Sequence, residues 1–392
     1  MVRFGPTVAA LCLVGVVVVG QLYTALPLLG RFGHSWTTTA GSAGATVTAF
    51  SLGYAFGFLL SGPVSDRIGR RRVILAGLIA TSVATALFAG APNEPAGVTL
   101  RALQGMCAAS FAPPALAYLA DRIEPNRRVA ATTWLTSSFL AAGVLGQVFA
   151  QTVAENLDWR TVYWISAVLL AGGAALLALV LDGRQIGPVA STAAVYRAMG
   201  RLLTRPALML LLATTATVLC GFVALYAGLQ LAGPSGIAGA PHKLLELRAG
   251  ALPAMVAIPL SAALTARIDP ARRVCLALTA AGAVSLVMAL LDLGDDLSLP
   301  VLVMLLLGFV AGIAMAVPSL VQAIGARSGA ARGAGVALYT FVLFIGASLG
   351  PALASATAGH GFAAVAGCVG ALSACGAVLA GVAARLPVRT EG

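Results

Sequence analysis

The chain has 392 residues, of which 59% are hydrophobic and only 9% are charged. Soluble domains carry about 25% charged residues, so this composition excludes an ordinary soluble domain and indicates an integral membrane protein. The net charge of +11 does not indicate a nucleic-acid partner, because the arginines lie in short segments between apolar runs. Their expected partner is the surface of the lipid bilayer.

Apolar runs bounded by glycine, proline or charge predict twelve membrane-spanning helices. The first six spans are 5–29, 42–61, 73–92, 96–119, 130–154 and 160–181. After a polar stretch, six more follow at 207–232, 249–266, 274–293, 299–324, 333–357 and 360–384. We expect an all-α membrane protein with an N-terminal six-helix bundle over 1–181, a cytoplasmic linker over 182–206 and a C-terminal six-helix bundle over 207–392.

The basic residues indicate the topology. With the N-terminus placed inside, 19 of the 24 Lys and Arg residues fall in cytoplasmic segments, four fall in outer loops, and Arg101 lies in a helix. Cytoplasmic loops of membrane proteins carry such an excess of positive charge. We therefore expect both termini in the cytoplasm. The first apolar run is expected to be a retained helix and not a signal peptide.

Two faces with helical spacing divide the residues of the linker. The apolar face holds Val195, Met199 and Leu202, and the basic face holds Arg197, Arg201 and Arg205. This pattern predicts a short helix that lies on the inner leaflet. The alternative is a solvated basic linker.

An internal repeat supports the division into two halves. At an offset of 200, Leu60-Ser61 matches Leu260-Ser261, and Arg67-Ile68 matches Arg267-Ile268. Arg122 matches Arg327 at an offset of 205. The position of Asp66 is taken by Ala266 in the second copy, so that copy has lost its carboxylate.

The densest charge cluster lies between the second and third spans and reads Gly-Pro-Val-Ser-Asp-Arg-Ile-Gly-Arg-Arg-Arg over 62–72. A topological anchor, which is the alternative, needs only positive charge. The spacing is more specific than an anchor requires, because glycines and a carboxylate accompany the arginines. The residues concerned are Gly62, Asp66, Arg67, Gly69, Arg70 and Arg71. It resembles the signature loop of the major facilitator superfamily, the twelve-helix secondary transporters.

This resemblance implies two six-helix halves and a switch role for the loop. Gly62 and Gly69 are expected to let the chain turn where a side chain would clash. Asp66 is expected to meet the neighbouring arginines and the start of helix 11 at 332–335, and so to stabilise one conformation of a carrier.

A second motif, Arg-Ala-Leu-Gln-Gly over 101–105, resembles another signature of the same family. A guanidinium at membrane depth is costly and usually faces a cavity or a partner, which makes Arg101 and Gln104 candidates for the substrate cavity or for coupling. The alternative is an arginine whose side chain reaches the interface. The antiporter signature of helix 5 is incomplete, because Gly146 is followed by Gln147 and not by proline. Helix 11 carries Gly346, Gly350 and Pro351 instead, which weakens the expectation of drug/proton antiport.

Polar and aromatic residues in the helices complete the candidate cavity. Helix 1 carries Gln21 and Tyr23 in a segment that resembles bacterial sugar- and drug-efflux members of the superfamily. The other candidates are Trp134, Gln147, Gln151, Tyr226, Gln230, Gln322, Tyr339 and Phe344. For each of them, packing or a hydrogen bond between helices is the alternative.

No motif indicates an enzyme, a nucleotide site, a metal or another cofactor, since the six cysteines and three histidines show no ligand or catalytic spacing. We expect a monomeric secondary transporter of the bacterial cytoplasmic membrane that exports a small amphipathic molecule (a drug, a metabolite or a sugar-like compound) by alternating access, coupled to protons. The alternatives are a facilitator or importer of a sugar or metabolite, and a receptor or channel of the same fold.

The acidic residues restrict the expected substrate. None of them lies deep in a predicted span, and a desolvated cation without a counter-charge is costly. A neutral or anionic substrate is therefore expected to be preferred, and proton coupling must use a peripheral carboxylate or the substrate itself. The alternative is that Arg101 only braces helices and that cations bind to aromatic faces.

Overall fold

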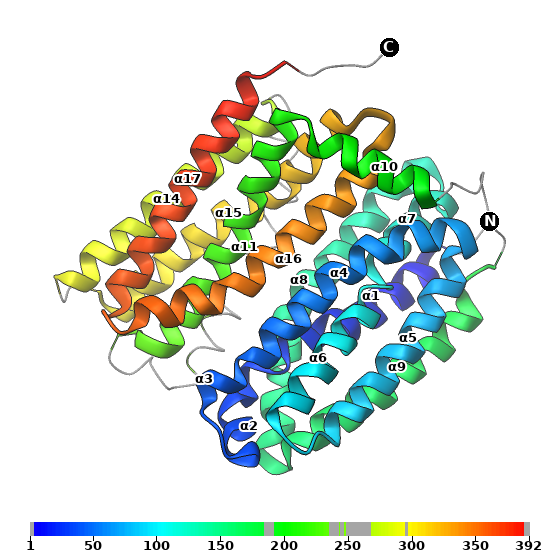
Figure 1. Cartoon of the computed structure of the whole chain (residues 1–392), viewed down its shortest axis with the longest axis horizontal. Helices are drawn as coiled ribbons and strands as arrows, with labels where there is room; N and C mark the ends of the chain where they lie inside the picture. The colour runs from blue at the N-terminus through cyan, green and yellow to red at the C-terminus, as the bar shows by residue number, and fades with distance from the viewer. Residues whose placement is uncertain are drawn as a thin grey trace. The chain divides into compact units, whose positions relative to one another are not determined.

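The structure is a computed structural model that describes residues 4–183, 192–234, 243, 247, 268–294 and 297–387. The described residues form helices and contain no strand, which confirms the all-α fold (Figure 1). The chain divides into two compact units, Met1–Ala194 and Val195–Gly392. The division falls inside the segment that we interpret as the linker.

The first unit contains the helices up to residue 180. They are α1 (Phe4–Tyr23), η1 (Leu26–Leu28), α2 (Leu29–Trp36), α3 (Ala40–Ala43), α4 (Ala45–Ile68), α5 (Arg70–Ala89), α6 (Glu94–Ala108), α7 (Ala112–Arg122), α8 (Pro125–Asn156) and α9 (Trp159–Val180). In this unit α1 packs on α8, α4 on α6 and α5 on α9 (Figure 1).

The second unit follows a helix that crosses the division, α10 (Thr192–Leu203). Its helices are α11 (Pro206–Ala232), α14 (Pro270–Leu293), α15 (Leu299–Ser328), η3 (Gly329–Ala331), α16 (Arg332–Ala358) and α17 (Phe362–Arg385). Here α11 packs on α16 and α14 packs on α17. These pairs correspond to α1 with α8 and to α5 with α9, so the repeat in the sequence is also a repeat in packing.

Ten helical segments of the described residues are long and apolar enough to cross a membrane, and each overlaps a predicted span. The predicted span 96–119 is not among them, because it is divided into α6 and α7. Pro113 and Pro114 cause the division, since proline has no N–H to donate and its ring clashes with the preceding turn. The predicted span 249–266 lies outside the described residues.

The first predicted span is wrong at its outer end. The run 5–29 is not one helix, because α1 stops at Tyr23 and helical structure resumes through η1 and α2 as far as Trp36. Pro27 cannot donate to the carbonyl of Tyr23, so the helix breaks there. Residues 30–36 read Gly-Arg-Phe-Gly-His-Ser-Trp, and the glycines and polar residues among them favour a loop, whereas the structure has an amphipathic helix there.

The helices approach closely where glycine removes the side chain. A methyl group added at Gly105 of α6 would lie 2.2 Å from the carbonyl oxygen of Phe50 in α4. A similar close approach in the second unit is at Gly346 of α16, where an added methyl group would lie 2.2 Å from the carbonyl oxygen of Ala216 in α11. Small residues of this kind are the usual means by which membrane helices pack, because lipid supplies no hydrophobic drive between them.

Candidate functional site

Arg101 lies in the middle of a buried polar cluster in the first unit. Its side chain is 0% exposed. Nη1 donates to Oε1 of Gln104 at 2.7 Å, and Nη2 donates to the carbonyl oxygen of Gln21 at 3.0 Å. Gln104 continues the network, because its Nε2 donates to Oγ1 of Thr85 at 2.7 Å and to Oε1 of Gln21 at 3.2 Å. We call Gln21, Thr85, Arg101 and Gln104 the Arg101 cluster.

The charge of Arg101 is balanced without a carboxylate, since no ion pair among the described residues includes it. Its acceptor, the carbonyl of Gln21, belongs to the last turn of α1, and Thr24 Oγ1 donates to the same carbonyl at 3.1 Å. The C-terminal end of a helix carries partial negative charge that attracts a cation. The guanidinium carbon also lies 4.3 Å from the ring centre of Phe50, a cation–π contact.

An aromatic cluster covers Arg101 at the end of the first unit that the predicted topology places outside. Phe88 and Tyr163 lie within 6.0 Å of its guanidinium carbon and contact each other at 4.5 Å between ring centres. Phe32 of α2 packs edge-on against Trp159 at 4.8 Å, and Trp36 stacks on Phe32. We call these five residues the outer aromatic cluster. The cluster is not among the residues predicted from the sequence, although Phe32 and Trp36, four positions apart in α2, are a signal for it.

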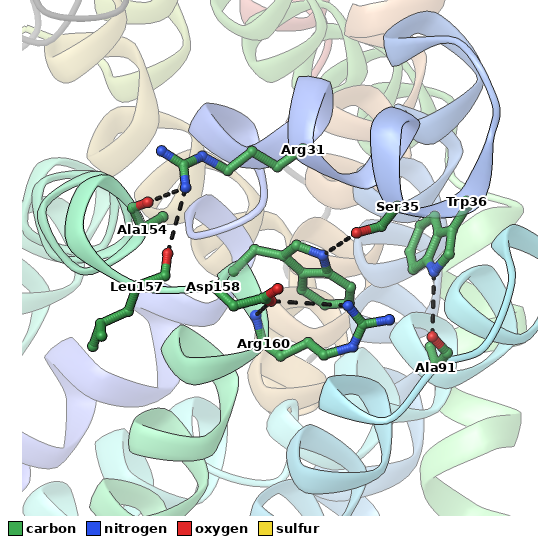
Figure 2. Close-up of polar contacts among 9 residues, drawn as sticks. Arg31, Ser35, Trp36, Ala91, Ala154, Leu157, Asp158 and Arg160 are labelled. Atoms are coloured by element: carbon green, nitrogen blue, oxygen red, sulfur yellow. Dashed lines mark hydrogen bonds and ion pairs between the residues drawn. The ribbon is translucent and has the colours of Figure 1, made fainter.

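Polar contacts fix α2 over this cluster (Figure 2). Arg31 reaches across to donate to the carbonyl oxygens of Ala154 and Leu157, at the end of α8. Nε1 of Trp159 donates to Oγ of Ser35 at 2.8 Å. Nε1 of Trp36 donates to the carbonyl oxygen of Ala91 at 3.3 Å. The break between α1 and α2 is thus held by the contacts of α2 on one side and by the hydrogen bond of Arg101 to Gln21 on the other.

The charge cluster at 62–72 is mostly helical, and not a loop as predicted. Only Gly69 leaves the helix, with a φ of 99° that favours glycine. The expectation for Gly62 is wrong, because it lies within α4 and an added methyl group there would meet nothing within 4 Å. The sharp turn therefore depends on one of the two glycines.

Arg70 links three helices at this turn. Its Nη2 lies 3.3 Å from Oδ1 of Asp66 in α4, and its Nε lies 2.6 Å from Oδ2 of Asp121 in α7. Nη2 of Arg71 donates to the carbonyl oxygen of Ala178 in α9 at 2.8 Å. Arg67 is exposed. The predicted contact of Asp66 with 332–335 would join the two units, and it stays a prediction.

Of the predicted cavity residues, Gln21, Arg101 and Gln104 are joined to one another by hydrogen bonds. In the first unit Gln147 is buried and donates to the carbonyl oxygen of Gly143 in its own helix. Gln151 donates to Glu155, Tyr23 is partly buried, and Trp134 is 66% exposed.

In the second unit Tyr226 and Tyr339 are buried, whereas Gln230 and Phe344 are partly buried. Gln322 accepts a hydrogen bond from Arg273 near the end of α15, so this candidate lies at a helix end and not at mid-membrane depth.

The described carboxylates lie at the ends of helices. Asp66 and Asp121 are in the last turns of α4 and α7, and Asp292 is in the last turn of α14. The others are Glu94, Glu124, Glu155, Asp158, Asp182 and Asp269, which lie in caps, in terminal turns or just beyond a helix. Arg101 is thus surrounded by neutral groups at the depth where it lies.

Comparison with known proteins identifies relatives. The family model described as Major Facilitator Superfamily matches residues 11–351. The chain is 32% identical over 165 residues to the putative uncharacterized transporter YgaY of Escherichia coli (strain K12), which is 42% of this chain and 40% of that protein. It is 29% identical over 161 residues to the MFS-type transporter YceJ of Bacillus subtilis (strain 168), which is 40% of each chain. It is 33% identical over 135 residues to the puromycin resistance protein pur8 of Streptomyces alboniger, which is 34% of this chain and 26% of that protein. The matched region spans at most about two fifths of the length of these relatives.

Proposed function

The chain belongs to the Major Facilitator Superfamily, and we propose that it is a secondary transporter that exports a small amphipathic molecule across the bacterial cytoplasmic membrane. The main support for a transport function is the family match over residues 11–351. Alternating access in such proteins comes from the rocking of two repeats around a site near the midplane. Similarity to a puromycin resistance protein supports export over import.

The placement of charge supports a neutral or anionic substrate. The carboxylates of the described residues lie at helix ends, where none can neutralise a cation at mid-membrane depth. A cationic substrate would then lose its hydration without gaining a counter-charge, which is costly. A neutral or anionic amphiphile avoids this cost.

We assign Arg101 a positioning role. The hydrogen bonds that it donates to Gln104 and Gln21 both end on oxygens of the protein, and its side chain is enclosed. It therefore acts on a substrate through the segment that it holds, the end of α1 with Gln21 and Tyr23. One planar guanidinium donates both to the end of α1 and to Gln104, whose amide also donates to Gln21, an arrangement that a lysine cannot reproduce.

Proton coupling is the last part of the proposal. Because the described carboxylates are peripheral, the proton is carried by a carboxylate at a helix end or by the substrate. Asp66 is the first candidate, since Arg70 links it to Asp121 and a change in its charge would alter the contacts of three helices.

The test uses the purified full chain in proteoliposomes with an imposed pH gradient, and a panel of matched amphiphiles. We expect movement of a neutral or anionic compound in the direction opposite to the proton flow, and a large decrease when the gradient is collapsed. Movement of substrate together with protons would contradict export. Movement unaffected by any ion gradient would indicate a facilitator and would contradict coupling.

A further inference from the structure

Arginines of the second unit gather around the last two turns of α15. Nη1 of Arg205 donates to the carbonyl oxygen of Arg327 at 3.1 Å. Nη2 of Arg273, from the first turn of α14, donates to Oε1 of Gln322. The side chain of Arg332 lies against Gly325, where an added methyl group would be 3.0 Å from its Nε. We call Arg205, Arg273, Arg327 and Arg332 the α15 arginine cluster.

Two members of the cluster are buried. Arg273 is 5% exposed and Arg327 is 7% exposed. Arg327 donates from Nη1 and Nη2 to the carbonyl oxygens of Ala323 and Ala383, at 3.4 and 3.2 Å. The Nε atoms of Arg273 and Arg327 are buried and have no hydrogen-bond partner among the described residues. A buried guanidinium normally has its donors occupied, because an unpaired buried donor is costly.

Three members of the cluster, Arg273, Arg327 and Arg332, form no ion pair among the residues that the structure describes. The hydrogen-bond acceptors of Arg273 and Arg327 are an amide oxygen and backbone carbonyls, which are neutral. Asp269 is close in sequence to Arg273, but its carboxylate accepts from the backbone N–H groups of Ala271 and Arg272 and so caps α14. Among the described residues, these three cations are thus without an acidic partner at this end of α15.

In the first unit, the arginine at the matching position has a carboxylate partner. Arg122, which matches Arg327 in the repeat, pairs with Asp182 at 2.7 Å. At the same offset of 205, the position of Asp182 is occupied by Pro387. The second unit has therefore kept the arginine and lost the acid.

We propose that the α15 arginine cluster binds the phosphate headgroup of an anionic membrane phospholipid. The cluster lies where α11, α14 and α16 begin and α15 and α17 end. These are ends of membrane spans, so the cluster is at the level of the lipid headgroups. Arginine pairs with phosphate through two or more N–H groups, and basic sites between helices at a membrane surface are suited to anionic headgroups. The lipid supplies the charge that Asp182 supplies in the first unit.

The test measures lipid binding to the full chain in detergent by native mass spectrometry and by thermal unfolding. The probes are a short-chain phosphatidylglycerol, the matching phosphatidylcholine and inorganic phosphate. We expect saturable binding of phosphatidylglycerol and a higher unfolding temperature in its presence. Arg273→Gln and Arg327→Gln should each weaken this binding by about tenfold or more, because a charged hydrogen bond is lost. Arg332→Gln, an exposed member of the cluster, gives a second test if a buried variant does not fold.

Arg272→Gln is the matched control, because Arg272 is exposed and adjacent to Arg273. Arg272→Gln removes only general surface attraction, so it should weaken the binding of phosphatidylglycerol by about fivefold at most. If Arg272→Gln and the cluster variants weaken lipid binding equally, the binding depends only on surface potential, and the proposed lipid site is wrong. Absence of saturable binding would overturn it too, and equal protection by inorganic phosphate or by phosphatidylcholine would overturn the assignment to an anionic lipid.

Discussion

Nη2 of Arg101 donates a hydrogen bond of 3.0 Å to the carbonyl oxygen of Gln21, in the last turn before α1 stops. The bond joins residues 80 positions apart and places a buried cation against the negative end of a helix. The outer aromatic cluster covers the same break from the other side through Phe32 and Phe88. A break in helix 1 is thus held from two sides by residues of the first unit.

Replacement of Arg101 by lysine should destabilise the first unit. An ammonium group lacks the planar fork that donates to both Gln104 Oε1 and the Gln21 carbonyl, and it changes the cation–π contact with Phe50. We expect a loss of about 1.5–3 kcal/mol, the contribution of a charged hydrogen bond, and a lower unfolding temperature in detergent. The control is Arg72→Lys, because Arg72 is exposed. An unchanged unfolding temperature for Arg101→Lys would show that the second bond is dispensable.

Neutralising Asp66 should shift the conformational equilibrium and leave the chain folded. Asp66→Asn removes one of the two carboxylates that share Arg70. A charge contact at a helix end contributes roughly 0.3–2 kcal/mol, which changes a near-balanced equilibrium several-fold. Cysteine accessibility on the two sides of the membrane measures the shift. The control is Asp158→Asn, which keeps a helix-capping residue at an exposed position. Identical accessibility and transport in Asp66→Asn would reduce the segment to a topological anchor.

Gly105 should not tolerate alanine. The added methyl group would lie 2.2 Å from the carbonyl oxygen of Phe50, which is backbone and cannot move aside without separating α4 from α6. We expect Gly105→Ala to destabilise by about 1–3 kcal/mol, as for overpacking in a core. Gly172→Ala in α9 is the matched control, because its methyl group would meet nothing within 4 Å. Equal stability of the two variants would contradict the close packing of α4 and α6.

The orientation of the chain can be tested at Gly200. This residue is exposed on α10, and an added side chain would meet nothing within 4 Å. In a variant without the six native cysteines, Gly200→Cys should be protected from an impermeant thiol reagent in intact cells and labelled after permeabilisation. Labelling from outside would place the segment 182–206 on the outer side and would contradict the predicted topology.

Much of the fold follows from the apolar runs, because length and hydrophobicity suffice to recognise a helix that crosses a membrane. The errors occur at prolines, where Pro27 and the Pro113–Pro114 pair divide runs that composition alone joins. The turn at 62–72 was also placed too early, since α4 continues through Pro63 to Ile68 and only Gly69 departs from the helix.

Individual residues of the candidate site can be predicted from the sequence, but the contacts between them cannot. A charge in an apolar helix is conspicuous, so Arg101 was found from the sequence. Its acceptor is a backbone carbonyl in α1, and every residue has one, so no side-chain pattern indicates it. The same holds for Arg71, which donates to the carbonyl of Ala178. Contacts that depend on where a helix ends can be predicted only once that end is known.

Transport of matched cationic, neutral and anionic amphiphiles by the wild type and by Arg101→Gln tests the central claim most directly. The wild type should prefer the neutral and anionic compounds. Arg101→Gln should transport them more slowly, because the end of α1 with Gln21 loses the charged bond that fixes it. Strong export of permanently charged cations, undiminished or improved in Arg101→Gln, would contradict the account.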